Sequence, residues 1–178
     1  MRRIIIEDSS RRFLPPYICG RGANIWRGPI DGNGLVGEEK IDRRSVGLRE
    51  VDLSVMTLET CLPADGTGTS FLRGYEKLTL LKAQGGRTVR LGGEIFFALL
   101  EDWERKQDNS HLEWLRKERG IRYLDFFGTV CRDAHGRPCV PAFIYCGRNH
   151  LWFWITRSLK SDVCWEAEHP SACLRTVV

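Results

Sequence analysis

Cysteine and histidine residues in the last third of the chain stand at spacings that approach those of a zinc site. Cys131-x3-His135 and Cys146-x3-His150 come near the short ligand pairs of structural zinc sites. Further candidate ligands follow downstream: Cys164, His169 and Cys173. Cys131 and Cys139, however, fall on opposite arms of a predicted hairpin, and burial as a thiol is the commoner fate of such residues. A small zinc-stabilised interaction or nucleic-acid-binding domain is therefore the alternative hypothesis, and we assign no metal ligand.

The same residue types also allow a nucleophilic pair. Cys164 and His169 are close enough in the chain for a Cys–His pair, but no third residue that would orient the histidine can be named. Carboxylates that could bind calcium are scattered rather than gathered in one oxygen-rich loop. They are Asp125, Asp133 and Asp162. We therefore expect no catalysis and no cofactor.

The whole chain has the length and composition of one globular domain. Its 178 residues are 42% hydrophobic and 28% charged, which is ordinary for a folded protein, so we expect a single domain over residues 1–178. The net charge of +4 is too mild to indicate nucleic-acid binding. The opening MRRIIIEDSS is too short for a signal-peptide core, and no apolar run approaches membrane-spanning length. We expect a cytoplasmic protein with reduced cysteines and no membrane contact.

Helical spacing is clearest in the middle of the chain. Residues 93–106 carry an apolar stripe of Ile95, Phe96, Leu99, Leu100 and Trp103, with Glu101, Asp102 and Glu104 off it. A second helix is predicted over residues 110–119, because Ser110 and Glu113 form a capping-box pattern and Gly120 is a typical helix stop. A third, less regular helix is predicted over residues 70–84.

Strands are predicted on both sides of these helices. Alternating or apolar segments occur at 4–6, 51–55, 88–91, 123–132, 140–145, 151–155 and 172–178. Residues 13–49 are rich in turn formers, and we expect only short strands there, near 17–19 and 23–26. The strands between residues 123 and 155 are predicted to form an antiparallel meander, and a last strand over 172–178 closes the chain.

Residues 146–171 combine fixed aromatic spacing with an assortment of other side chains. Trp152 and Trp154 share one face of a strand, and Phe153 and Ile155 share the other. A strand with one solvated face normally carries polar residues there. This one is apolar on both faces, so it is either a doubly covered core strand or part of a contact surface.

The run FFGTVCRDAHGRPCVPAFIYCGRN, the tryptophans set among varied residue types, and the closing W-x3-HPSACL together resemble variable proteins of diversity-generating retroelements. That resemblance implies a C-type lectin-like α+β fold. Two main helices would pack on antiparallel strands, and the N- and C-terminal strands would be adjacent. In that family a reverse transcriptase mutates template adenines, so asparagine codons diversify, whereas tryptophan codons contain no adenine and persist.

The resemblance assigns roles to residues of the segment 146–171. Trp152, Trp154 and Trp165 match the persistent scaffold. The positions that match the diversified, ligand-binding set are His150, Phe153, Ile155, Arg157, Ser158, Ser161, Val163 and Cys164. Lys160 and Glu166 are candidates for the same surface, although adenine mutation of asparagine codons alone does not produce them. We expect the Trp face to pack inward and the Phe153/Ile155 face to point outward.

The resulting hypothesis is a non-catalytic binding protein. Its main anchors would be Phe153, Ile155, Arg157 and His150, since aromatic and arginine side chains dominate many interfaces. The expected partner is a protein or another macromolecule, bound by a monomer.

Overall fold

The computed structural model describes residues 2–7, 23–24, 41–63, 70–133, 137–160 and 163–176. Within these ranges the chain is a mixed α+β structure with four α-helices and a mixed sheet, which confirms the predicted α+β class. The strand predicted near residues 17–19 lies outside the described residues. Of the segment 23–26, only β2 (Ala23–Asn24) is described.

Three helices match the segments with helical spacing, although the helix predicted over 70–84 begins only at Gly74, because Leu72 and Arg73 pair as a strand with Cys164 and Trp165. The three helices are α4 (Gly74–Ala83), α5 (Gly93–Lys106) and α6 (His111–Arg119). α6 begins where the Ser110 hydroxyl accepts a 3.3 Å hydrogen bond from the Glu113 N–H, and it ends at Gly120, whose φ of 67° favours a residue without Cβ. α3 (Arg43–Val46) and the 3-10 turn η1 (Gln107–Asn109) are short. Among the described residues, no helix combines the length and apolarity needed to cross a membrane.

Asp102 departs from the predicted polar face of α5, because it is buried rather than exposed. Its carboxylate accepts a 2.7 Å hydrogen bond from the His111 N–H and lies 2.7 Å from His111 Nδ1. The first N–H groups of a helix have no partner within the helix. Asp102 satisfies one of them and so joins α5 to α6.

Most described strands belong to one mixed sheet. Its strands are β2, β4 (Met56–Glu59), β6 (Thr88–Arg90), β7 (Tyr123–Asp125), β8 (Cys131–Asp133), β9 (Pro138–Cys146), β10 (Leu151–Ser158) and β12 (Ser171–Arg175). The order is β2-β8-β9-β7-β12-β4, with β10 paired to β9 and β6 paired to β12. All pairs are antiparallel except the bridge between β7 and β12.

Two strand predictions need correction because turns divide the segments. The strand predicted over 51–55 ends early, because β3 (Glu50–Asp52) stops where the Asp52 carboxylate accepts hydrogen bonds from the Ser54 N–H and hydroxyl and closes a turn; β4 begins only at Met56. Val55 is consequently exposed. The segment 123–132 divides into β7 and β8. Between them Gly128 passes so close to Arg90 that a Cβ would lie 2.2 Å from the Arg90 carbonyl oxygen.

The expectation that the N- and C-terminal strands are adjacent is wrong for the described chain. β1 (Arg3–Ile5) pairs with β3 in a separate two-stranded sheet. β12 instead pairs with β4, β6 and β7, which occupy its edges and leave β1 no place beside it. A third small sheet joins β5 (Leu72–Arg73) to β11 (Cys164–Trp165).

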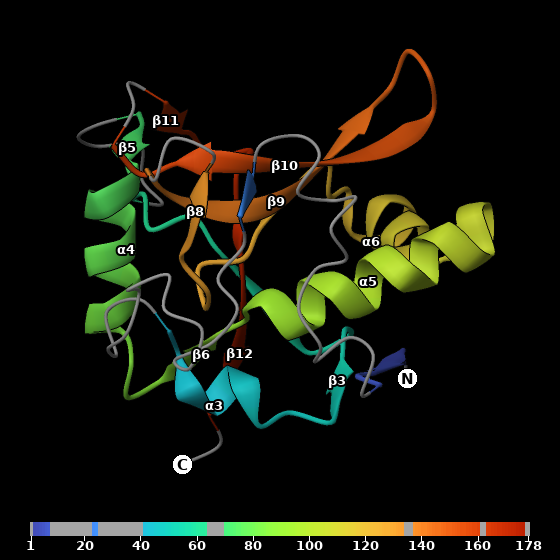
Figure 1. Cartoon of the computed structure of the whole chain (residues 1–178), viewed down its shortest axis with the longest axis horizontal. Coiled ribbons are helices and arrows are strands. Elements are labelled where there is room, and N and C mark those ends of the chain that lie inside the picture. Colours follow the sequence, from blue (N-terminus) through green and yellow to red (C-terminus); the bar gives the residue numbers. More distant parts are fainter. Residues whose placement is uncertain are drawn as a thin grey trace.

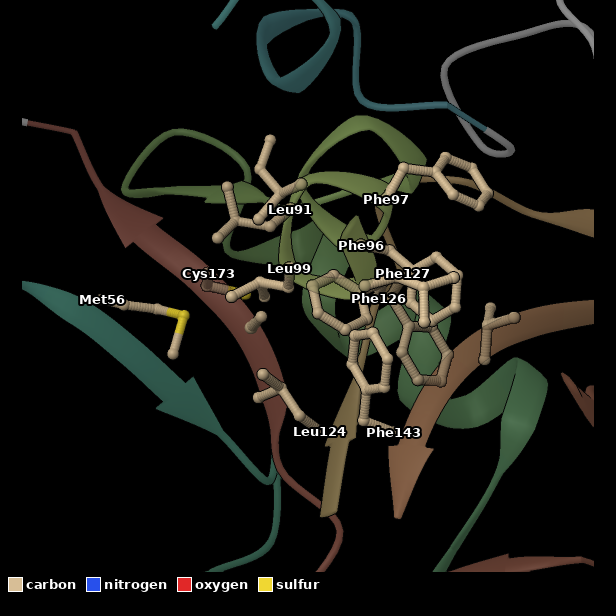
Figure 2. Close-up of a cluster of buried hydrophobic side chains, with 14 of the residues drawn as sticks. Met56, Leu91, Phe96, Phe97, Leu99, Leu124, Phe126, Phe127, Phe143 and Cys173 are labelled. Carbon is tan, nitrogen blue, oxygen red and sulfur yellow. The ribbon is translucent and has the colours of Figure 1, made fainter. Parts of the chain in front are cut away.

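The hydrophobic core lies between the sheet and α5. Figure 1 shows α5 and α6 near one end of the β9–β10 hairpin, and α4 with β5 and β11 near the other end. In the centre Phe96 of α5 stacks on Phe143 of β9 with ring centroids 4.5 Å apart. Figure 2 shows Phe126 and Leu124 gathered around this pair. The sheet face in contact with α5 and α6 is called the inner face below, and the opposite one the outer face.

Candidate functional site

The register of the β9–β10 hairpin divides its residues cleanly between the two faces. Trp152 lies opposite Tyr145 and Trp154 opposite Phe143, on the inner face. Phe153 lies opposite Ile144 and Ile155 opposite Ala142, on the outer face. A one-residue shift in this register would exchange the two sets.

Trp152 is a buried anchor of the inner face. Only 1% of its surface is exposed, and its indole N–H donates a 3.0 Å hydrogen bond to Glu113 Oε1 on α6. Arg116, one turn further along α6, forms a 2.9 Å ion pair with the same carboxylate. Trp154 is half-buried and meets Phe96 edge-on. The predicted inward orientation of Trp152 and Trp154 is confirmed.

His150 sits in the exposed turn between β9 and β10. Its φ of 53° lies in the left-handed region, which few residues other than glycine and asparagine adopt readily. His150 Nδ1 lies 3.1 Å from the Tyr145 hydroxyl, and the Arg116 guanidinium lies 4.6 Å from the Tyr145 ring centroid. The turn is thus held against α6 by Tyr145.

The outer face of the hairpin is apolar and partly uncovered near this turn. Phe153 is 36% exposed and Leu151 is 42% exposed. Ile144, Cys146 and Ile155 on the same face are half-buried. The predicted outward orientation is therefore confirmed for Phe153, whereas Ile155 contributes only part of its side chain to the surface.

The other end of the outer face is covered, and this corrects the expectation that Arg157 is a surface anchor. Arg157 is only 7% exposed, and its guanidinium lies 3.3 Å from Asp125 Oδ2 on β7. It also donates a 2.9 Å hydrogen bond to the Cys164 carbonyl and lies 4.3 Å from the Trp165 ring centroid. Arg157 follows the strand alternation of Phe153, but α4 and β11 cover this part of the face.

Asp125, Arg157, Lys77 and Trp165 form a buried polar cluster. The Trp165 N–H donates a 2.9 Å hydrogen bond to Asp125 Oδ2, and Lys77 Nζ lies 3.9 Å from the same oxygen. Lys77 also donates a hydrogen bond to the His169 carbonyl. Such groups are stable inside a protein only when they are paired and hydrogen-bonded. The cluster fixes the third scaffold tryptophan, Trp165, between α4 and the sheet.

Burial sets the proton affinities in and around this cluster. Desolvation raises the pKa of the Asp125 carboxyl, and the charges of Arg157 and Lys77 oppose that effect. Desolvation lowers the pKa of Lys77 to about 8, against the attraction of Asp125. Desolvation, together with the positive charges of Arg157 and Lys77, lowers the pKa of His169 to about 4. His169 is therefore neutral at neutral pH, and its Nδ1 accepts a 3.1 Å hydrogen bond from the Glu166 N–H.

The remaining candidate positions lie beyond β10, apart from Ser158, which is the last residue of that strand. Lys160, Val163 and Glu166 are exposed, and Ser158 and Cys164 are half-buried. Ser161 lies outside the described residues. Since β10 spans roughly 23 Å at about 3.3 Å per residue, these positions are well separated from His150 and Phe153. Figure 1 shows β10 running toward β5 and β11, so the candidates follow one path from the β9–β10 turn to β11.

Several residues on this path were not identified from the sequence. Leu151, Ile144 and Cys146 share the outer face with Phe153, and exposed Phe71 precedes β5 beside β11. Which β9 residues lie beside Phe153 depends on the pairing of the two strands, and the local sequence does not determine that register. The apolar type of Leu151 and Ile144 was the available signal, but it equally fits a core strand.

The grouping of candidate metal ligands can be examined within the described ranges. There, no group of three or more histidine, cysteine, aspartate or glutamate side chains is placed to hold a metal ion. His135 lies outside those ranges. His169 packs edge-on against Tyr123 with ring centroids 4.5 Å apart.

No protein-family model, curated protein or solved structure matches the chain.

Proposed function

We propose that this chain is a variable protein of a diversity-generating retroelement, and that it binds a macromolecular ligand through the outer face of β10 and the segment around β11. It is a non-catalytic, cytoplasmic monomer with a C-type lectin-like fold and a variable region at about 146–171. The observation that carries the proposal is the contrast between neighbours on one strand. Trp152 is buried and hydrogen-bonded, whereas Phe153 is exposed on an apolar face.

This contrast is what a diversified binding protein requires. Positions that change must tolerate many side chains without loss of the fold, and positions that do not change must hold the backbone in place. All three proposed scaffold tryptophans have core contacts: Trp152 with Glu113, Trp154 with Phe96, and Trp165 with Asp125. Phe153, Val163 and Glu166 project from the same segment to the surface.

The geometry also refines the proposed binding set. His150, Phe153 and Ile155 form one group near the β9–β10 turn, with Leu151 beside them. Lys160, Val163, Cys164 and Glu166 form a second group around β11. Arg157 moves from the binding set to the scaffold, because its guanidinium is engaged by Asp125 and Trp165. An exposed apolar group of this kind favours binding by shape and a few anchors.

Two matched libraries test the proposal at the protein level. In the first library Phe153, Ile155, Val163 and Glu166 are randomised, and in the second Trp152, Trp154 and Trp165 are randomised. Each is displayed on cells and sorted for protease resistance, and the survivors are selected for binding to hen lysozyme as a model target. We expect most members of the first library to stay resistant and to yield binders, whereas most members of the second are degraded. Equal loss of resistance in both libraries would refute the proposal.

A further inference from the structure

Cys131 and Cys139 lie directly opposite each other in the antiparallel ladder of β8 and β9. Their sulfur atoms are 3.3 Å apart, and the Cys131 thiol also lies 3.2 Å from the Cys139 carbonyl oxygen, to which it donates. Both residues are buried in the hydrophobic core and are present as thiols. Residues opposite each other in such a ladder have Cα atoms about 4.5–5.5 Å apart, which falls within the range that a disulfide spans.

We propose that Cys131 and Cys139 are a redox modification site, which a small-molecule disulfide such as oxidised glutathione converts into a cross-strand disulfide. One cysteine thiolate attacks a sulfur of the oxidant and releases one reduced thiol. The second cysteine then attacks the resulting mixed disulfide at the protein sulfur and releases the other reduced thiol. One S–S bond forms as one is broken, the two cysteine protons pass to the two released thiols, and the oxidant takes up the two electrons.

The required movement is small. A disulfide bond is about 2.05 Å long, so the two sulfur atoms need to approach by a little over 1 Å, which side-chain rotation supplies. The product carries no polar hydrogen, and it therefore suits the apolar surroundings that the two thiols occupy now. The bond also joins strands that the chain connects only through residues 132–138.

The position of this pair links it to the strand that carries the outer face. Cys139 lies opposite Cys131 on one side and opposite Ser158 of β10 on the other. A disulfide at this point would fasten β8 to β9 beside the end of β10. The inference does not depend on the proposed binding function, because it rests on the geometry of the two sulfur atoms.

Burial determines how the reaction proceeds. A buried thiol reacts slowly with a dissolved oxidant, so exchange occurs when the β8–β9 hairpin opens locally. Mild denaturant that leaves the fold intact should therefore accelerate oxidation. Cross-linking restricts the unfolded chain, so the oxidised protein should melt several degrees higher, about 5 °C for a chain of this size.

Oxidation of the full-length protein with excess oxidised glutathione tests the proposal. After alkylation and chymotryptic digestion, which cuts after Phe127, Phe143 and Tyr145 and so separates Cys139 from Cys146, mass spectrometry identifies peptide 128–143 with neither cysteine alkylated and two hydrogens fewer. We expect a Cys131–Cys139 linkage, the loss of two hydrogens from the intact mass, and reversal by dithiothreitol. Two results would overturn the proposal. In the first, both cysteines of the oxidised sample are alkylated after denaturation. In the second, either cysteine is linked only to a different cysteine.

Two variants complete the test. Cys146→Ser removes a thiol at the opposite end of β9, half-buried on the outer face, and it should leave both the linkage and the increase in melting temperature unchanged. Cys139→Ala should abolish both effects. If Cys139→Ala fails to fold, the peptide linkage in the unaltered protein still decides the outcome. A rise in melting temperature of the same size in Cys139→Ala would contradict the proposal.

Discussion

The indole N–H of Trp152 donates a 3.0 Å hydrogen bond to the Glu113 carboxylate and thereby ties β10 to α6. The Glu113 carboxylate also forms an ion pair with Arg116, and the Glu113 backbone N–H donates a hydrogen bond to the Ser110 hydroxyl. Glu113 therefore belongs to the first turn of α6. The strand that carries the outer face is in this way attached to a helix whose ends are well defined.

Substitution of Trp152 by phenylalanine should reduce the free energy of unfolding by about 2–3 kcal/mol. The change removes a hydrogen bond to a charged group and leaves space in the core. Urea denaturation followed by circular dichroism measures the effect. A loss below about 0.5 kcal/mol would show that the bond to Glu113 contributes little to the fold.

Substitution of its neighbour Phe153 by serine should reduce the free energy of unfolding by less than about 1 kcal/mol, because the ring is already 36% exposed. The same denaturation experiment provides the comparison, and Phe153→Leu serves as a conservative control. A loss as large as that of Trp152→Phe would indicate that the outer face is covered and would favour a doubly buried core strand.

Substitution of Arg157 by alanine should be the most damaging single change, with a loss of about 3–5 kcal/mol. It leaves Asp125 buried without its main partner. Arg157→Lys keeps the charge but loses the bond to the Cys164 carbonyl, so we expect an intermediate loss and a folded protein. Lys160→Ala, on the exposed turn after β10, is the control and should be nearly neutral. Retention of full stability by Arg157→Ala would contradict the burial of this side chain.

Acidification should destabilise the protein through His169. Its pKa is lowered to about 4 by burial and by the charges of Arg157 and Lys77, whereas an unfolded chain has a histidine pKa of 6.5. Between these values the unfolded chain binds more protons, so stability is present above pH 6.5 and is lost as the pH falls toward 4. The half-exposed ring is screened by solvent, so the loss is on the order of 1 kcal/mol.

Comparison with His169→Gln isolates this effect. The free energy of unfolding is measured at several pH values between 7 and 4 for both proteins. The unaltered protein should lose stability faster than the variant over that range, since glutamine does not titrate. If the two proteins lose stability in parallel as the pH falls, His169 has the same pKa in the folded and the unfolded chain.

The three longer helices were predictable because local signals determine them, whereas α3 lies in the segment 13–49, where only short strands were expected. Ser110, Glu113 and Gly120 mark both ends of α6, and the apolar stripe from Ile95 to Trp103 fixes the length of α5. The alternation of Trp152 and Phe153 likewise predicted which residue of the pair faces inward. In these segments local preference and tertiary packing agree.

The errors arise where a distant element decides the environment. Arg157 has the same strand parity as Phe153, but it is buried by its ion pair with Asp125 on β7 and its contacts with Cys164 and Trp165 on β11. Asp102 is polar and off the apolar stripe, yet the start of α6 needs its carboxylate. The pairing of β1 with β3 depends on which edges of β12 are already occupied, which no local pattern reveals.

Sequencing of the locus around the coding region tests the central claim most directly. The proposal predicts a near-repeat of the codons for residues 147–171 beside a reverse transcriptase gene, differing from the coding copy mainly at adenines. The codons for Trp152, Trp154 and Trp165 should be identical in the two copies, and those for Phe153 and Val163 should differ. A locus with neither a repeat nor a reverse transcriptase gene would contradict the assignment.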